Sequence, residues 1–203
     1  ALNHLRYEPV LNGIFLRVNL GVFDPTDGTH EVSDLNPHLD YSTPTVPLEI
    51  RQESLGDPRG ILWAPDGERA YVTGMGSNNL IVLDATGSRL ADQAAIKVGE
   101  GPTGMALDRD GSRLFVLNRF GASISVVDTV RLEETARTPF PDSTPEFVKK
   151  GRRHLYDTHH SSGLGQVSCA SCHVDGRMDR LAWDLGAPEG ETDVVDPNIE
   201  IIG

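Results

Sequence analysis

The feature that most constrains this chain is an internal repeat with a period of 44 residues. The segment 56–67 recurs as 100–111, and Asp84 recurs as Asp128. Each unit carries an Asp-Gly pair, which favours a hairpin turn because glycine adopts a positive φ without steric cost. Two hairpins of an ordinary sandwich are the alternative, but a fixed period with its turns in phase indicates a repeat architecture.

The first unit contains four short runs of β-branched and aromatic residues. They lie near 60–64, 69–74, 79–84 and 93–98. Four strands in about 40–50 residues is typical of one blade of a β-propeller. We therefore expect a mainly β fold, with propeller blades over residues 1–142 and the two clear repeats within 55–140.

The repeat also carries a recognisable motif. It resembles the YVTN family of propeller repeats, with Tyr71-Val72-Thr73-Gly74 at the position of the name motif and Gly74 in place of its asparagine. A propeller closes with about 4–8 blades. Because open blades leave exposed edges, we expect other chains or further sequence to complete it.

Residues before the repeats also alternate as a strand does. Leu16, Val18, Leu20 and Val22 are separated by polar or small residues, which predicts a half-buried strand. The segment 24–28 follows as a turn rich in Asp and Gly. No later carboxylate is spaced to complete a calcium-binding loop, so calcium is not expected.

The pattern changes after residue 142. Ser143 and Glu146 form a capping-box sequence around a proline, which predicts a helix running to about Tyr156. This helix carries a basic cluster, whose side chains either face solvent or neutralise a buried anion such as a haem propionate; its members are Lys149, Lys150, Arg152 and Arg153.

Both cysteines of the chain lie in Cys169-Ala170-Ser171-Cys172-His173. C-x-x-C-H is the attachment signature of c-type haem, because two thiols on one helical turn can reach the two vinyl groups of one porphyrin while the adjacent histidine binds the iron. A structural zinc site needs four ligands, and no further cysteine exists. The motif therefore predicts one covalently bound haem c.

The flanking residues resemble the first haem-binding segment of the di-haem cytochrome c peroxidase family. The matching parts are Gly151-Arg152-Arg153-His154-Leu155-Tyr156-Asp157, Ser161-Ser162-Gly163, the motif with its neighbours to Arg177, Asp179 and Trp183. The order of parts also resembles bacterial proteins that join a propeller to a cytochrome. The resemblance implies a small α-helical cytochrome c-like segment at 143–186, in which Cys169 and Cys172 form the thioethers and His173 is the proximal iron ligand.

This chain has one C-x-x-C-H motif where that family has two, which leaves the sixth ligand of the iron open. The candidates are His154, His159, His160 and Met178. Alternatively the iron is five-coordinate, or another chain supplies the ligand. Arg177, just after the motif, is a candidate partner for a propionate.

Charge narrows the classes of partner. With 18 Lys and Arg against 30 Asp and Glu, the formal net charge is −12. That charge excludes nucleic acid and anionic membrane surfaces as partners, and it favours redox proteins with a basic docking surface.

The sequence has no apolar run long enough to span a membrane. We expect residues 187–203 to be an acidic, irregular tail of a truncated domain.

These observations predict an electron-transfer module, one c-type haem on a propeller scaffold within a larger protein or assembly. Two alternatives stay open: a peroxidase-like oxidoreductase with an open distal site, and a propeller that binds other molecules while its haem is structural. Because haem is attached to such motifs outside the cytoplasm, we expect a bacterial periplasmic, outer-surface or extracellular protein.

Overall fold

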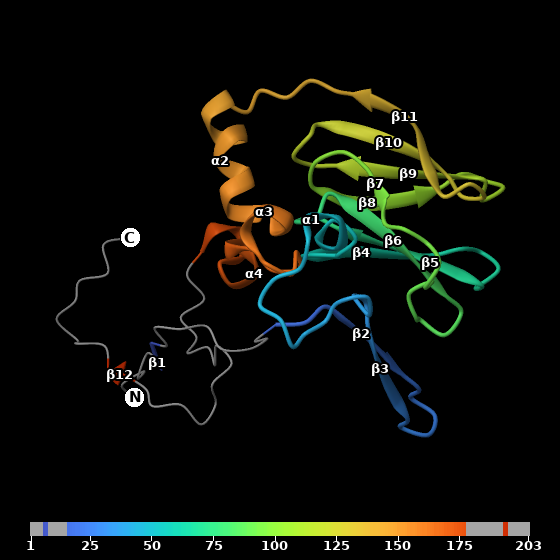
Figure 1. The fold of residues 1–203 in the computed structure, drawn as a ribbon. Helices are drawn as coiled ribbons and strands as arrows, with labels where there is room; N and C mark the ends of the chain where they lie inside the picture. The colour runs from blue at the N-terminus through green and yellow to red at the C-terminus, as the bar shows by residue number, and fades with distance from the viewer. Residues whose placement is uncertain (1–5, 8–15, 178–192, 195–203) are drawn as a thin grey trace.

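The computed structural model describes residues 16–177 and, as backbone, the pairs 6–7 and 193–194 (Figure 1). Its main elements are two four-stranded antiparallel sheets in which each strand pairs with the next along the chain. The first sheet consists of β4 (Pro58–Trp63), β5 (Arg69–Gly74), β6 (Asn79–Asp84) and β7 (Ile96–Lys97). The second consists of β8 (Pro102–Leu107), β9 (Arg113–Asn118), β10 (Ser123–Asp128) and β11 (Glu133–Pro139).

The repeat in the sequence is a repeat in the structure. The first three strands of one sheet begin and end 44 residues from their equivalents in the other. The fourth strands differ: β7 is shorter than the predicted 93–98, whereas β11 has seven residues and ends at a proline. The chain is therefore mainly β and propeller-like, and we call the two sheets the first and second blade.

Both Asp-Gly turns form as predicted. Gly67 and Gly111 have φ values of +74° and +75°. The N–H of Gly67 donates to the carbonyl of Ala64 at 2.9 Å, and that of Gly111 donates to the carbonyl of Asp108 at 3.2 Å. A side chain at either glycine would be strained by this backbone.

The structure explains why Gly74 stands at the position where the repeat motif has an asparagine. In the second blade the buried Asn118 donates from Nδ2 to the hydroxyls of Ser123 and Ser125, at 3.0 and 2.8 Å. In the first blade Gly74 occupies that position, and a Cβ there would collide with Ser77 Oγ. Ser77 instead donates to Oδ1 of Asn79 at 2.6 Å. In the first blade the hydrogen bond between asparagine and serine is therefore made by an asparagine on β6.

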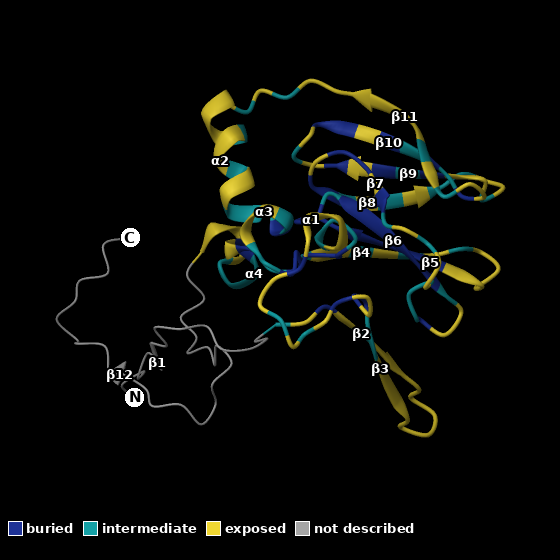
Figure 2. Cartoon of the chain, in the orientation of Figure 1, coloured by how far each residue is buried: buried dark blue, intermediate teal, exposed yellow. Residues whose placement is uncertain are grey.

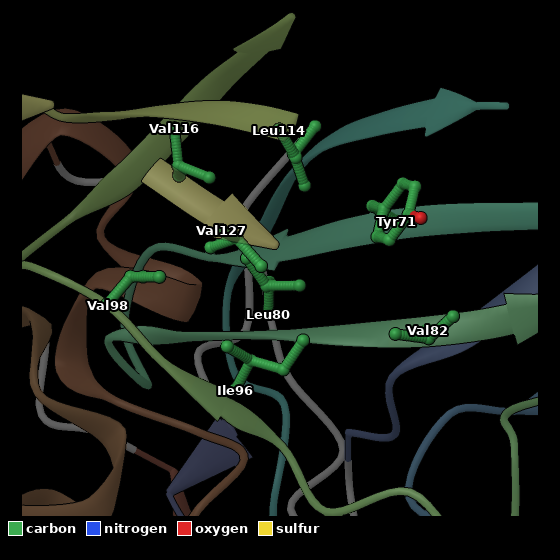
Figure 3. Packing of buried hydrophobic residues seen from close by; sticks show 8 residues of the cluster. All are labelled: Tyr71, Leu80, Val82, Ile96, Val98, Leu114, Val116 and Val127. Atoms are coloured by element: carbon green, nitrogen blue, oxygen red, sulfur yellow. The ribbon is translucent and has the colours of Figure 1, made fainter. Parts of the chain in front are cut away.

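The main hydrophobic core lies between the blades (Figure 3). One face of the first blade packs against one face of the second, with β4 beside β8. The buried residues of this core are Tyr71, Leu80, Val82, Ile96, Val98, Leu114, Val116 and Val127. One hydrogen bond also crosses the interface, from the Thr73 hydroxyl to the Thr103 carbonyl at 2.9 Å.

The opposite face of the first blade is covered by the chain before it. Val18, Leu35 and Leu55 pack there against the blade. Residues 16–55 also contain the hairpin of β2 (Asn19–Phe23) and β3 (His30–Asp34) and the helix α1 (Leu48–Arg51). The predicted strand therefore exists, but its far end is exposed rather than half-buried (Figure 2).

The remaining elements are short. They are α2 (Glu146–Tyr156), α3 (Thr158–Ser161), α4 (Cys169–Cys172), a 3-10 turn at Val174–Gly176, and β1 (Arg6–Tyr7), which pairs with β12 (Asp193–Val194). In the described part of the chain, no helix has the length and apolar character needed to cross a membrane. The described helices between 143 and 177 do not form an evident cytochrome-like segment.

The helix α2 was predicted with the wrong cap. It begins after Pro145, and Ser143 makes no capping bond. The carboxylate of Asp142 instead accepts the N–H of Thr144 at 2.9 Å and pairs with Lys149 at 3.0 Å. Hydrogen bonds from Thr144, together with Lys149, hold the pKa of Asp142 well below its usual range. The turn ahead of the helix is thus closed by Asp142.

The core between the blades predicts that shortening a buried side chain lowers the stability of the protein far more than shortening an exposed one. Leu114→Ala should lower the free energy of unfolding by about 2–5 kcal/mol, because it leaves a cavity in a fully buried site. Val130→Ala, at a position that is 81% exposed, should change it by less than about 0.5 kcal/mol. Equilibrium denaturation of both variants measures the difference, and equal losses would contradict this packing.

Candidate functional site

The two cysteines lie at the ends of a single helical turn, α4. The N–H of Ser168, just before the turn, donates to Ser171 Oγ at 3.0 Å, which fixes where the turn starts. Ala170 is fully buried and holds the turn against the rest of the chain, whereas Cys169 is exposed and Cys172 is half-buried. Both thiols therefore belong to one anchored turn, as C-x-x-C-H attachment requires.

His173 follows the turn and is oriented by the backbone. Its Nδ1 lies 3.2 Å from the carbonyl oxygen of Arg177. When Nδ1 carries the proton and donates it to that carbonyl, the lone pair of Nε2 is left for a metal. The loop that brings this carbonyl back passes through Asp175 and Gly176, both at positive φ. These residues therefore fit a proximal haem ligand and its orienting partner.

The segment leading to α4 is fixed to the chain around the first blade by polar contacts. The N–H of Thr158 donates to the carbonyl of Gly76 at 2.9 Å. The hydroxyl of the buried Ser54 donates to the carbonyl of Leu164 at 2.7 Å. Further along, Nε2 of the buried Gln166 donates to the carbonyl of Leu16 at 3.1 Å. The segment before the cysteine turn is thus connected to the first blade and to the stretch 16–55 that covers it.

The structure gives His159 a structural contact. Its Nε2 lies 3.0 Å from the carbonyl oxygen of Ser54, and its own carbonyl accepts from Arg51 Nη1 at 3.2 Å. Burial lowers the pKa of His159, while the bond to the Ser54 carbonyl and the charge of Asp157 act in the opposite sense. Iron ligation through Nε2 would break this contact, so His159 is the less suitable of the three histidine candidates.

The other candidates for the sixth ligand fall into two groups. His154 and His160 are exposed, and their rings meet edge to face with centroids 5.9 Å apart. Met178, Asp179 and Trp183 lie outside the described residues. Between residues 16 and 177, no three His, Cys, Asp or Glu side chains gather as a metal cluster. A haem iron does not need such a cluster, because the porphyrin supplies four nitrogens.

One member of the basic cluster, Arg152, holds α2 against the second blade. Arg152 donates to the Phe120 carbonyl at 3.3 Å and to Thr144 Oγ1 at 3.2 Å, and its guanidinium lies 5.1 Å from the centre of the Phe120 ring. The ring of Phe120 also meets that of Tyr156 at 4.8 Å. Arg152 is therefore a docking residue and not simply a solvated charge, whereas Lys149 pairs with Asp142 in the segment just before the helix.

Two open cavities flank this docked helix. One, of about 400 Å³, lies between α2 and the turn after β5, and the other, of about 640 Å³, lies between α2 and the ends of β10 and β11. Both are lined by Lys149, Arg152 and Phe120. Glu100 also lines both, so their charge is mixed. Neither cavity is lined by Cys169, Cys172 or His173.

Sequence reasoning did not find the contacts that support the site. Asn36 donates from Nδ2 to the carbonyl of Leu55 at 2.9 Å and reaches Oε1 of Gln166 at 3.3 Å. Both polar side chains are fully buried, and no local pattern distinguishes them from surface residues. Phe120, by contrast, interrupts a polar turn between two strands, and that signal could have marked it as a contact.

Comparison with known proteins places the chain only coarsely. No family model matches it. A stretch of 106 residues is 43% identical to an uncharacterized protein of Caenorhabditis elegans, which covers 51% of this chain and 19% of that protein. The chain therefore spans about a fifth of the length of this relative.

Solved structures show similarities that are partial as well. The chain resembles hydrazine synthase of Kuenenia stuttgartiensis (28% identity, TM-score 0.40, 44% of this chain and 25% of that one). It also resembles virginiamycin B lyase of Staphylococcus aureus (17%, 0.43, 62% and 35%) and the periplasmic gluconolactonase of Pseudomonas aeruginosa (17%, 0.38, 44% and 28%). At these TM-scores the fold assignment rests on the two blades themselves.

The half-buried environment of His159 predicts a pH dependence of stability. Because burial holds its pKa below the ordinary value of 6.5, the unfolded chain binds protons more readily. The contribution of His159 is therefore fully present above about pH 6.5 and is lost as the pH falls below it. His159→Gln should flatten the pH profile of the unfolding free energy between about pH 7 and 5.

The matched control is His30→Gln, at an exposed position on the β2–β3 hairpin. It should leave the profile as it is in the unsubstituted chain. Denaturation midpoints at several pH values measure both variants. An unchanged slope in His159→Gln would contradict a role for this half-buried histidine.

Proposed function

We propose that this chain is a propeller-like scaffold that carries one covalently bound c-type haem for electron transfer. The observation that carries the proposal is the geometry of α4 and His173. Two cysteines share one anchored turn, and the next residue is a histidine whose Nδ1 faces the carbonyl of Arg177. That arrangement matches what thioether attachment and axial ligation by one imidazole need.

Each residue has a defined task in this proposal. Cys169 and Cys172 bind the porphyrin through thioethers, and His173 provides the proximal iron ligand. The Arg177 carbonyl orients the imidazole, while its exposed side chain is a candidate partner for a propionate. When bound, the haem would supply a one-electron redox couple, whose potential depends on its burial and its sixth ligand.

The scaffold itself is the best supported part of the assignment. Both blades, their shared core and the segment that covers the first blade account for most of the described chain. This favours one second function, a propeller that binds other molecules and in which the haem is structural. A peroxidase-like activity would require an open distal site on the iron.

The net charge of the chain and the chemistry of haem attachment support proposals for the partner and the compartment. A net charge of −12 favours redox partners that present a basic docking surface, since opposite charges accelerate encounter. Thioether attachment of haem takes place outside the cytoplasm, so we propose a periplasmic, outer-surface or extracellular location in a bacterium.

The haem assignment is tested by expressing the full chain together with a c-type haem attachment system. We expect the intact mass to rise by one haem and the pyridine haemochrome spectrum to be that of a thioether-linked haem. A double variant, Cys169→Ala with Cys172→Ala, should lose both signals, whereas Ser161→Ala should keep them. Unmodified mass in the unsubstituted chain would contradict the proposal.

Three readouts then separate the functions. Electron transfer predicts reversible reduction without peroxide turnover. A peroxidase predicts peroxide-dependent turnover and a five-coordinate ferric state. Scaffold function alone predicts that partner binding survives in the double cysteine variant.

A further inference from the structure

We propose that the larger cavity beside α2 is a binding site for a small carboxylate that carries an aromatic ring. The cavity has a volume of about 640 Å³ and lies between α2 and the ends of β10 and β11. Ligand sites in proteins have volumes of roughly 300–1,000 Å³, so a ligand of this size fits. The proposal goes beyond the haem function and does not depend on it, because neither the cysteines nor His173 line this cavity.

Arg152 provides the cationic group of the site. Its guanidinium has five N–H bonds, of which one on Nη1 donates to the Phe120 carbonyl and one on Nη2 donates to Thr144 Oγ1. Within residues 16–177, no acceptor lies within hydrogen-bonding distance of the other three, and no carboxylate forms an ion pair with Arg152. Arg152 is therefore held in place and still has donors for a ligand.

Phe120 fixes the position of this guanidinium. Gly101 lies on one side of the Phe120 ring, at a φ of +65°, and a Cβ at that glycine would collide with the ring. The ring of Tyr156 has its centre 4.8 Å from that of Phe120, and the guanidinium of Arg152 lies 5.1 Å from the same centre. These contacts hold the cation in one position before a ligand arrives, which lowers the entropic cost of binding.

The lining opposite α2 is largely apolar. Phe140 follows β11, and its N–H donates to the carbonyl of Ala122 at 2.8 Å. The backbone at Phe140 is therefore fixed, yet the residue is 41% exposed. Pro139 and Ala122 line the cavity beside it. An aromatic ligand ring can pack against Phe140 in the offset or edge-to-face arrangement that aromatic pairs prefer.

The charges of the lining favour an anion. Three cations and two carboxylates line the cavity. Lys149 pairs with Asp142 at 3.0 Å. Arg137 pairs with a glutamate of its own strand at 2.8 Å and also interacts with the charge of Glu100. Among the described residues, Arg152 is thus the lining cation that has no carboxylate partner.

These features together select the class of ligand. A planar guanidinium binds a carboxylate through two parallel N–H···O bonds, and the apolar lining takes up the ring. A propionate of the proposed haem has the same carboxylate chemistry, and α2 also contacts the cysteine turn α4. We assign the site to a free aromatic carboxylate because the ring of such a ligand would cover Phe140.

The test measures binding of phenylacetate to the full chain by isothermal titration calorimetry. The first titrations use the variant Cys169→Ala with Cys172→Ala, which cannot attach haem covalently. We expect phenylacetate to bind at least tenfold more tightly than phenylacetamide, which lacks the charge, and than acetate, which lacks the ring. The haem-loaded chain should bind phenylacetate with the same affinity within about twofold, since the cysteine turn lies outside the cavity.

Two substitutions examine the assigned residues separately. Arg152→Lys keeps the charge and removes the planar fork, so the dissociation constant of phenylacetate should rise at least tenfold. Phe140→Ala removes the ring contact without touching the side chains that hold α2, and it should raise that constant by about threefold to tenfold. Phe147→Ala is the matched control. It makes the same change at a residue of α2 that is 77% exposed and lines neither cavity, so affinity should not change.

Three results would overturn the proposal. Phenylacetate could bind no more tightly than its amide or acetate, or not at all. Its affinity could be the same in Phe140→Ala as in the Phe147→Ala control. Binding could also be present in the haem-free variant and absent from the haem-loaded chain, which would assign the guanidinium to a haem propionate. Because the first titrations need no haem, this proposal and the haem assignment can fail independently.

Discussion

Face-to-face packing of two β-sheets is the interaction on which the rest of this structure depends. An antiparallel sheet with apolar residues on both faces cannot be stable alone in water, so each face of the first blade needs a cover. The second blade provides one, through Leu114, Val116 and Val127. Residues 16–55 provide the other, through Val18 and Leu35. The order of layers in the molecule follows from this requirement.

The position of the cysteine turn depends indirectly on the same packing. Residues 16–55 cover the first blade and also hold the segment before α4, through Ser54, Asn36 and Arg51. Buried polar groups of this kind are costly when they lose a partner, so the segment has one well-defined position. A haem attached to Cys169 and Cys172 would therefore lie next to a segment that hydrogen bonds connect to the scaffold.

How far the sequence could predict this structure depended on whether the signal was local. The blade strands and the Asp-Gly turns were predicted because alternation and turn chemistry act over a few residues. The cap of α2 was predicted wrongly, since the helix begins after Pro145 and the turn before it is closed by Asp142. Asn36 and Gln166 could not be predicted, because their contact joins residues 130 positions apart. The proposed haem attachment rests on the local C-x-x-C-H motif, whereas a sixth ligand would be a property of the tertiary structure.

The central claim is that His173 and the two cysteines hold a redox-active haem on this scaffold. An optical redox titration of the purified chain, after extraction of any non-covalent haem with acidified solvent, tests it most directly. The account predicts a haem absorbance that survives extraction and follows a single reversible one-electron wave, with about 59 mV for each tenfold change in the ratio of the two states. Loss of the absorbance on extraction, or a spectrum that does not respond to potential, would contradict it.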